Sequence, residues 1–197
     1  IQGDFSTHEG IYRFADQVRQ AAPKLRAVIH NASAWQAESP EVPPEQVMAA
    51  MLQIHVYTPY LLNQLLESCL TGQGQAGADI IHLTDYVVEK GSDKHIAYAA
   101  SKAGLLSLAR TLSGELHPRG IRVNGLSPGP TETPALGKLG LAEADERALR
   151  DDIRALVPIG RMGSALELAK AAVFLAADES AFMVGAELQM DGGVGNL

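Results

Sequence analysis

The sequence predicts an α/β protein built on a doubly wound parallel sheet. Short apolar runs alternate along the chain with longer segments of helical periodicity, and Pro, Gly and Asn separate the two kinds of segment. Strands that alternate with helices imply right-handed crossovers between parallel strands, and ligands of such sheets bind beyond the carboxyl ends of the strands. The chain has 197 residues, of which 46% are hydrophobic, so we expect a single domain with one core.

The first half should contain two helices and two strands. A capping box, Ser6-Thr-His-Glu9, opens the first helix. An apolar strand over residues 25–30 follows, and a Pro-rich loop leads into a long apolar helix over roughly residues 45–70. Pro59 should kink that helix, because proline has no backbone N–H to donate. The next strand is expected at residues 79–84.

The second half repeats the alternation. Residues 97–116 are rich in Ala and Leu and predict a helix, which the Pro and Gly of His117-Pro-Arg-Gly120 should stop. A strand is expected at residues 121–126. A second capping box, Ser164-Ala-Leu-Glu167, opens a helix that runs to about residue 177. Residues 187–190 should close the sheet.

Tyr98 and Lys102 lie four residues apart on the predicted helix and therefore share a face. An ammonium beside a phenol favours the phenolate and lowers the phenol's pKa, so the pair can serve as a general acid. An aromatic and a basic residue also meet at this spacing on many helices without any catalytic role. Asp85, thirteen residues before Tyr98, and the motifs around the pair favour catalysis.

Four motifs occur in the order and spacing typical of short-chain dehydrogenases/reductases. They are Asn31-Ala32-Ser33 after an apolar strand, the Tyr98/Lys102 pair, Arg122-Val-Asn-Gly-Leu-Ser-Pro-Gly129 with Thr133, and Gln189-Met-Asp-Gly-Gly193. The chain resembles this family over nearly its whole length. Residues 28–35 and 82–102 are similar to pteridine reductases and, more closely, to bacterial dihydromonapterin (dihydrofolate-type) reductases. From about Thr111 onward, including the substrate-covering segment 134–157, the chain resembles generic family members.

The resemblance implies a Rossmann-like sheet and assigns roles to residues. Tyr98, Lys102 and Asp85 would manage protons, and His55 stands where family members commonly have an Asn that anchors a water chain, which histidine can also do. Asp4 would meet the adenine of a nicotinamide cofactor, and Lys102 its nicotinamide ribose. The residues expected to bind the cofactor are Asp4, Asn31, Ala32, Ser33, Tyr98, Lys102, Pro128, Gly129, Thr131 and Thr133. Asn31 and Pro128 have an alternative interpretation, because Asn and Pro-Gly commonly end strands without any functional role.

The resemblance further implies an NAD(P)H-dependent reductase of a dihydropterin, with NADPH expected and NADH left open. Family members usually have serine at the position of Asp85. An ionised carboxylate accepts hydrogen bonds, which suits the N–H groups of a pterin, whereas a protonated one could feed a proton relay. Asp85 could instead cap the turn that follows it. Two alternative functions stay open: a carbonyl reductase or alcohol dehydrogenase, and a non-catalytic fragment that acts as an assembly or binding module.

The first residue is Ile1, and residues 1–4 resemble the end of a strand. We therefore expect the chain to lack the family's first βαβ unit, whose helix N-terminus holds the cofactor pyrophosphate. Residues 1–197 alone are accordingly expected to bind cofactor weakly or not at all. A literal G-x-G-x-x-G occurs at Gly72–Gly77, but it follows a helix and precedes a strand. Since dinucleotide binding needs the reverse context, this segment is predicted to be a flexible connection.

The composition of the chain limits which kinds of partner and which cellular compartment are expected. The net charge of −7 argues against a nucleic-acid binder, and no apolar run is long enough to cross a bilayer. The single cysteine, Cys69, cannot form an internal disulfide, and no signal peptide is recognised, so a cytoplasmic enzyme is expected. We also expect a homodimer or homotetramer, because two helices carry more leucine than one face of a sheet needs: Leu61, Leu62, Leu65, Leu66, Leu105, Leu108 and Leu112.

Overall fold

The computed structural model describes residues 1–71, 77–93, 95–134 and 136–196, except for the side chains of residues 138 and 139. Residues 72–76, which contain most of the G-x-G-x-x-G segment, lie outside this part of the chain. The prediction that this segment is a flexible connection therefore stays a prediction.

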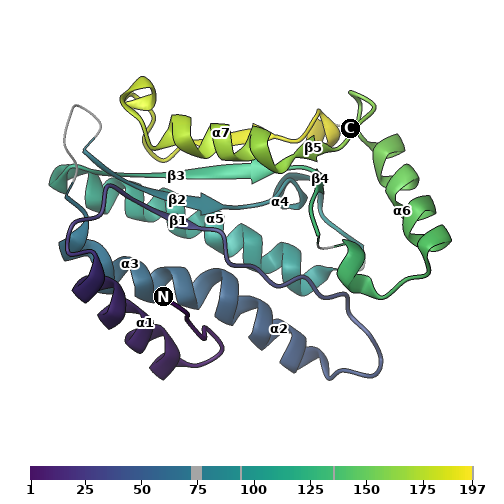
Figure 1. Ribbon diagram of the computed structural model, residues 1–197, viewed down its shortest axis with the longest axis horizontal. Helices are drawn as coiled ribbons and strands as arrows, with labels where there is room; N and C mark the ends of the chain where they lie inside the picture. The colour runs from purple at the N-terminus through teal and green to yellow at the C-terminus, as the bar shows by residue number, and fades with distance from the viewer. Residues whose placement is uncertain (72–76, 94, 135, 197) are drawn as a thin grey trace.

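The described residues form three layers around a parallel sheet (Figure 1). The sheet has the order β1-β2-β3-β6. Its strands are β1 (Ala27–His30), β2 (Ala78–Leu83), β3 (Ile121–Pro128) and β6 (Glu187–Met190). Three helices cover one face, namely α1 (His8–Ala21), α3 (Thr58–Leu66) and α5 (Ile96–Leu116), and α7 (Ala165–Leu175) covers the other. The predicted α/β class and parallel sheet are confirmed.

Smaller elements connect these layers. The helices are α2 (Pro44–Leu52), α4 (Val87–Lys90) and α6 (Glu143–Leu156), and a two-stranded parallel sheet pairs β4 (Thr131–Glu132) with β5 (Gly163–Ser164). A π-helix, η1 (Gln53–Tyr57), lies between α2 and α3. Short 3₁₀ turns are η2 (Glu67–Cys69), η3 (His117–Arg119), η4 (Leu136–Leu139), η5 (Asp178–Ser180) and η6 (Val194–Asn196).

The core lies on both faces of the two central strands. Along β2, Ile80 packs with residues of α5 such as Leu112, whereas the next residue, Ile81, packs with Leu175 of α7. The two-residue period of a strand produces this alternation, because successive side chains point to opposite faces. Aliphatic residues recur along both central strands, although Asp79 and His82 interrupt them in β2 and Arg122 and Asn124 interrupt them in β3. This recurrence is why both strands could be predicted from the sequence.

The long predicted helix is interrupted one turn before Pro59. Gln53–Tyr57 forms a π-helix, in which the backbone N–H of Thr58 donates to the carbonyl of Gln53, and the Thr58 hydroxyl donates to the same oxygen at 2.8 Å. The sequence predicted a kink at Pro59. In the structure the helix changes instead to a π-helix in the turn before the proline, at Gln53–Tyr57. This wider turn carries His55.

The predicted N-terminal capping box is wrong by one residue. Thr7 is the N-cap of α1, and its hydroxyl accepts from Gly10 N at 3.1 Å. Ser6 instead contacts Asp4, because its N–H and hydroxyl both donate to Asp4 Oδ1, at 2.9 and 2.7 Å. The second predicted box is confirmed: Glu167 N donates to Ser164 Oγ, and Ser164 N donates to Glu167 Oε2.

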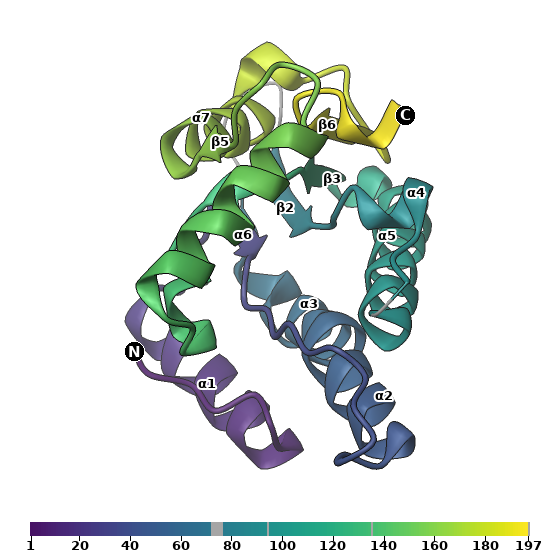
Figure 2. The ribbon, with the colours of Figure 1, turned by 90° about the vertical axis from the view of Figure 1, so that its right-hand side faces the viewer.

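Helix α6 was not predicted, and Figure 2 shows it crossing the end of the molecule toward which the strands point. Charged residues of this helix pair along its own surface, as Arg147 does with Glu143. Arg150 and Arg154 both reach Glu132 of β4, at 2.5 and 3.1 Å. The structure describes every residue of α6 and buries none of them. Most of its residues are charged, so the few apolar residues at helical spacing, Leu149, Ile153 and Leu156, are a weaker sign of a helix than a long apolar segment is.

The leucines that suggested an oligomer are largely used within the chain. Four are buried: Leu62, Leu66, Leu105 and Leu112. The other three, Leu61, Leu65 and Leu108, pack partly against the same core clusters. This leucine content therefore gives no surplus apolar surface, and the oligomeric state stays a prediction. Within the described residues, no helix is long and apolar enough to cross a membrane.

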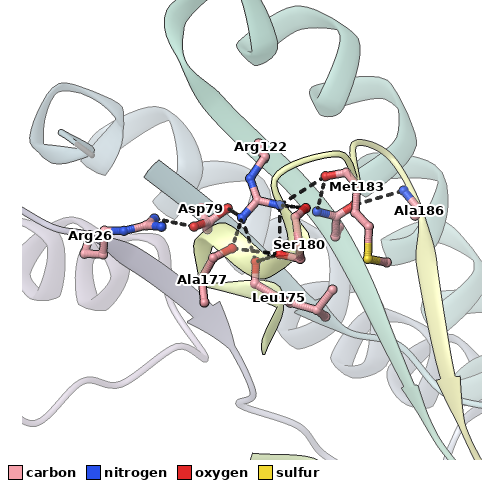
Figure 3. A network of polar contacts seen from close by, with 9 residues as sticks. Arg26, Asp79, Arg122, Leu175, Ala177, Ser180, Met183 and Ala186 are labelled. Carbon is pink, nitrogen blue, oxygen red and sulfur yellow. Dashed lines mark hydrogen bonds and ion pairs between the residues drawn. The ribbon is translucent and has the colours of Figure 1, made fainter. Parts of the chain in front are cut away.

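At the amino ends of the strands, Arg122 joins the sheet to the segment that leads into β6 (Figure 3). Its guanidinium forms an ion pair of 2.7 Å with buried Asp79, which also pairs with Arg26. The same guanidinium donates to the backbone carbonyls of Leu175, Ala177, Ser180 and Met183. Asn124, two residues farther along β3, adds hydrogen bonds to Met183 O and from Ala186 N, each at 3.0 Å. The Arg-Val-Asn motif is thus a structural clamp.

Candidate active site

The carboxyl ends of the strands border a cavity of about 570 Å³. Asn31 follows β1, Asp85 follows β2, and Pro128 ends β3, so three successive strands of the sheet contribute to it. Its lining contains nine of the predicted site residues: Asn31, Ser33, Asp85, Tyr98, Lys102, Pro128, Gly129, Thr131 and Thr133. Apolar residues of β1, β3 and α7 complete the wall, among them Ile29, Leu126 and Ala172.

Three predicted site residues lie outside this cavity. Asp4 lines a second cavity of about 580 Å³, which shares Ser33 with the first. Ala32 lines a third cavity, which runs along β1. His55 is 1% exposed and lies beneath the surface, where it contacts Ser33. Ser33 therefore links the first cavity with the Asp4 cavity and with buried His55.

Tyr98 lies in the first turn of α5, and its hydroxyl donates to Asp85 Oδ2 at 2.6 Å. The other carboxylate oxygen, Oδ1, accepts from Val87 N at 3.1 Å. One oxygen of Asp85 thus caps the turn after β2, as one of the alternatives from the sequence proposed, while the other meets the tyrosine; the catalytic role of Asp85 stays a prediction. The turn fixes the carboxylate in front of Tyr98.

The electrostatics of this pair differ from the expectation. Burial and the neighbouring Asp85 carboxylate raise the pKa of Tyr98, so the predicted lowering of that pKa by Lys102 is wrong for this arrangement. Burial also raises the pKa of Asp85, against the opposing effects of the Tyr98 hydroxyl, the Val87 N–H and the Lys102 charge. Tyr98 consequently keeps its proton at neutral pH and remains a hydrogen-bond donor.

Lys102 lies one turn after Tyr98 on the same face of α5. Its Nζ donates to Leu83 O at 2.7 Å and lies 5.6 Å from the centroid of the Tyr98 ring. Burial lowers the pKa of Lys102 to about 8, although the Asp85 carboxylate acts in the opposite direction. The ammonium is therefore held against the end of β2, and the cavity receives a cation that titrates near neutral pH.

Glu38 is a site-supporting residue that sequence reasoning missed. Its carboxylate accepts from Ala97 N at 2.7 Å and from Ile96 N at 3.1 Å, and so caps the helix that carries Tyr98. Trp35, three residues earlier, stacks on His95 with ring centroids 4.6 Å apart. Both contacts fasten the loop after β1 to the start of α5. Since the partners are about 60 residues apart, no local sequence signal could reveal them.

Gly129 forms the opposite wall, and its lack of a side chain is required there. A Cβ atom at this position would lie 2.5 Å from Asp191 Cα. Asp191 itself is held in place, because its carboxylate accepts from Gly193 N and Gly195 N at 2.8 and 2.7 Å. The C-terminal Gln-Met-Asp-Gly-Gly motif therefore supports the Pro128-Gly129 wall from behind. No group of acidic, His or Cys residues in the described part of the chain is arranged to hold a metal ion.

Sequence comparison relates the chain to redox enzymes. A family model described as "Enoyl-(Acyl carrier protein) reductase" matches residues 1–195. Dihydromonapterin reductase from Enterobacter sp. (strain 638) is 51% identical over 158 residues, which cover 80% of this chain and 64% of that protein. The dihydromonapterin reductase of Escherichia coli (strain K12) is 57% identical over 128 residues, 65% of this chain and 53% of that protein. The chain thus spans less than two thirds of these curated relatives.

Solved structures share the fold. The Pseudomonas aeruginosa RhlG/NADP active-site complex aligns with a TM-score of 0.88 and 26% identity, covering 99% of this chain and 76% of that one. A mutant of a Serratia marcescens short-chain dehydrogenase/reductase aligns with a TM-score of 0.83 and 25% identity, covering 99% of this chain and 76% of that one.

Proposed function

This chain belongs to the short-chain dehydrogenase/reductase family, and we propose that it reduces a dihydropterin with NADPH. The observation that carries the proposal is the 2.6 Å hydrogen bond from Tyr98 to Asp85, next to buried Lys102 in a cavity at the strand ends. The similarity to dihydromonapterin reductases supports the substrate class. The experiment that tests it is steady-state turnover of a dihydropterin against a panel of ketones.

The residues of the cavity fit a nicotinamide cofactor. Gly129 leaves room where any Cβ would collide with Asp191, and the apolar residues of β3 and α7 give the cavity an apolar wall against which a ring could pack. Lys102 brings a cation with N–H donors that suit ribose hydroxyls. Thr131 and Thr133 line the same cavity, and their hydroxyls would suit a carboxamide. When bound, the cofactor supplies the hydride, and the protein orients the reactants and manages protons.

Reduction of a C=N bond also needs a proton at nitrogen, and Tyr98 Oη is the group placed to donate it. Loss of this proton is costly in a buried site beside a carboxylate. The Lys102 ammonium, 5.6 Å from the centroid of the Tyr98 ring, would offset part of that cost when the phenolate forms. Asp85, whose pKa is raised by burial, can then take up a proton from solvent and pass it to Tyr98 Oη across the 2.6 Å hydrogen bond. The proton that restores the donor therefore comes from solvent by way of Asp85.

Substrate choice should depend on the carboxylate of Asp85. Asp85→Ser removes an acceptor that suits pterin N–H groups and supplies a hydroxyl that can donate to a carbonyl. We expect this variant to lose dihydropterin reduction selectively, by about tenfold or more in kcat/KM, while ketone reduction is kept or improved. The ratio of the two kcat/KM values in the native full-length protein is the measurement. An unchanged ratio would make Asp85 a turn residue only.

The pH profile should report the Lys102 ammonium. Because the pKa of Lys102 is about 8, its stabilising charge is present below that pH and is lost as pH rises through it, so kcat/KM should fall above about pH 8. Asp85 raises this pKa, and Asp85→Asn should therefore move the fall to lower pH. The exposed Asp93→Asn variant is the matched control and should leave the profile unchanged. If the fall in kcat/KM at high pH occurs at the same pH in Asp85→Asn as in the unaltered protein, it does not report Lys102.

We also expect a homodimer or homotetramer. Large apolar side chains remain exposed on the outer side of the α2–η1–α3 segment, including Leu52, Tyr57 and Tyr60. A self-complementary contact would cover them by pairing the same surface of two copies. Light scattering at micromolar concentration is the measurement, and a monomeric mass would contradict the expectation.

A further inference from the structure

His55 is held between two serines that come from different parts of the fold. Its Nε2 lies 2.8 Å from Ser33 Oγ in the loop after β1, and its Nδ1 lies 2.8 Å from Ser101 Oγ in α5. The ring also meets Tyr98 edge-on, with centroids 5.4 Å apart and planes at 85°. The π-helix that presents His55 is a form of backbone often found at functional sites.

The surrounding hydrogen bonds determine which ring nitrogen carries the proton. Ser101 Oγ donates its only hydrogen to Tyr98 O at 2.7 Å, so it must accept from His55, and Nδ1 must be protonated. Ala34 N–H is directed at Nε2 at 3.4 Å, which requires that nitrogen to be an acceptor. Both constraints select the same tautomer. Burial and the charge of Lys102 lower the pKa of His55 to about 3, so the ring stays neutral.

This tautomer also orients Ser33. Because Nε2 accepts, the Ser33 hydroxyl hydrogen points toward His55, a contact shorter than the alternative at 3.4 Å to Ala34 O. Ser33 Oγ is then left with lone pairs for any group in the two cavities that it lines. Both nitrogens of His55 are bonded to protein groups, so neither is available for the water chain that the family resemblance implied.

We propose that His55 is a positioning residue: as the Nδ1-protonated tautomer it fixes Ser33 Oγ as a hydrogen-bond acceptor facing the cavities, and it joins the loop after β1 to the helix that carries Tyr98. His55 acts through Ser33 and does not carry a proton. The proposal rests on the proposed reductase function for its kinetic readout only, since the tautomer can be measured without turnover.

The first experiment reads the tautomer directly. Nitrogen NMR of the ¹⁵N-histidine-labelled protein distinguishes protonated from unprotonated ring nitrogens, and His55→Phe identifies the signal of this residue. We expect a protonated Nδ1 and an unprotonated Nε2 at neutral pH. The opposite tautomer, or a doubly protonated ring, overturns the proposal. Absent dihydropterin turnover together with the expected tautomer would overturn the proposed reaction and leave this inference standing.

The second experiment is a double-mutant cycle on kcat/KM. His55→Phe keeps a ring but loses both hydrogen bonds, and Ser33→Ala removes the hydroxyl, so each should lower kcat/KM by about tenfold. If His55 acts through Ser33, the double variant should be no worse than either single variant. Additive losses, or a loss in His55→Phe with none in Ser33→Ala, contradict the proposal.

Further variants separate positioning from folding. His55→Gln can still accept from Ser33 and should recover most of the activity lost in His55→Phe, which a purely structural role of the ring would not allow. Should His55→Phe fail to fold, Ser101→Ala tests the same bridge, because it removes the acceptor that selects Nδ1 protonation. The contact from Ala34 N at 3.4 Å still favours an unprotonated Nε2 in this variant, so we expect only part of the His55 population to change tautomer, and kcat/KM to fall as in Ser33→Ala. An unchanged kcat/KM in Ser101→Ala overturns the proposal.

Discussion

Tyr98→Phe is expected to lower turnover by about 10²–10⁴-fold, the usual contribution of general acid catalysis, and to leave cofactor affinity nearly unchanged. The phenyl ring keeps the edge-on contact with His55 and stays beneath the Lys102 ammonium. Only the proton donor and its hydrogen bond to Asp85 are lost. Turnover comes from steady-state kinetics of the native full-length protein, and affinity from titration with NADPH.

Tyr86→Phe provides the control for this result. Tyr86 follows Asp85 directly and is partly buried, but it is absent from the cavity lining. Its hydroxyl should therefore be dispensable, with turnover close to that of the unaltered protein. Equal losses in both variants would show a general effect of tyrosine removal near Asp85. Unchanged turnover in Tyr98→Phe would remove Tyr98 from the chemistry.

Arg122→Met is expected to lower the free energy of unfolding by about 3–5 kcal/mol, because removing one partner of a buried pair leaves the other charge uncompensated. Arg122 and Asp79 are 3% and 1% exposed, and Arg122 also bonds four backbone carbonyls ahead of β6 (Figure 3). Arg26 remains beside Asp79 and offsets only part of the loss. Urea denaturation of the variant measures the change.

Arg13→Met is the matched control, since the same substitution at an exposed ion pair with Glu9 should cost about 1 kcal/mol or less. A double variant that also replaces Asp79 by Leu should recover part of the stability, because exchanging a buried ion pair for apolar groups is far less costly than breaking it. If Arg122→Met destabilises no more than Arg13→Met, the network of Figure 3 is not a clamp.

The elements that could be predicted are those determined by residues close together in the sequence. Residues 121–126 alternate aliphatic with polar side chains in a short segment, and the Ser164/Glu167 capping box closes within four residues. Helix α6 escaped prediction because it buries none of its described side chains, although its Glu-to-Arg pairs four residues apart gave a usable signal. The π-helix before Pro59 had no signal beyond the proline.

The sequence predicted which residues line the candidate site better than it predicted their pKa values. Residue types and spacing placed Tyr98, Lys102 and Asp85 together, and the structure brings all three into one cavity. The direction of the Tyr98 pKa was wrong, because it depends on burial and on a carboxylate whose position follows from the turn after β2. Glu38 supports the site from a distant segment, so only the folded chain reveals it. Asp191 belongs to a motif that the sequence already singled out, but its contact with the Gly129 wall is seen only in the fold.

The most direct test of the central proposal is NADPH oxidation by the native full-length protein, compared between dihydromonapterin and a panel of simple ketones. Reduction of a dihydropterin through the Tyr98, Lys102 and Asp85 arrangement predicts a higher kcat/KM for dihydromonapterin than for every ketone. The same preference should disappear in Asp85→Ser. Efficient ketone turnover without dihydromonapterin turnover would contradict the proposal and identify a carbonyl reductase instead.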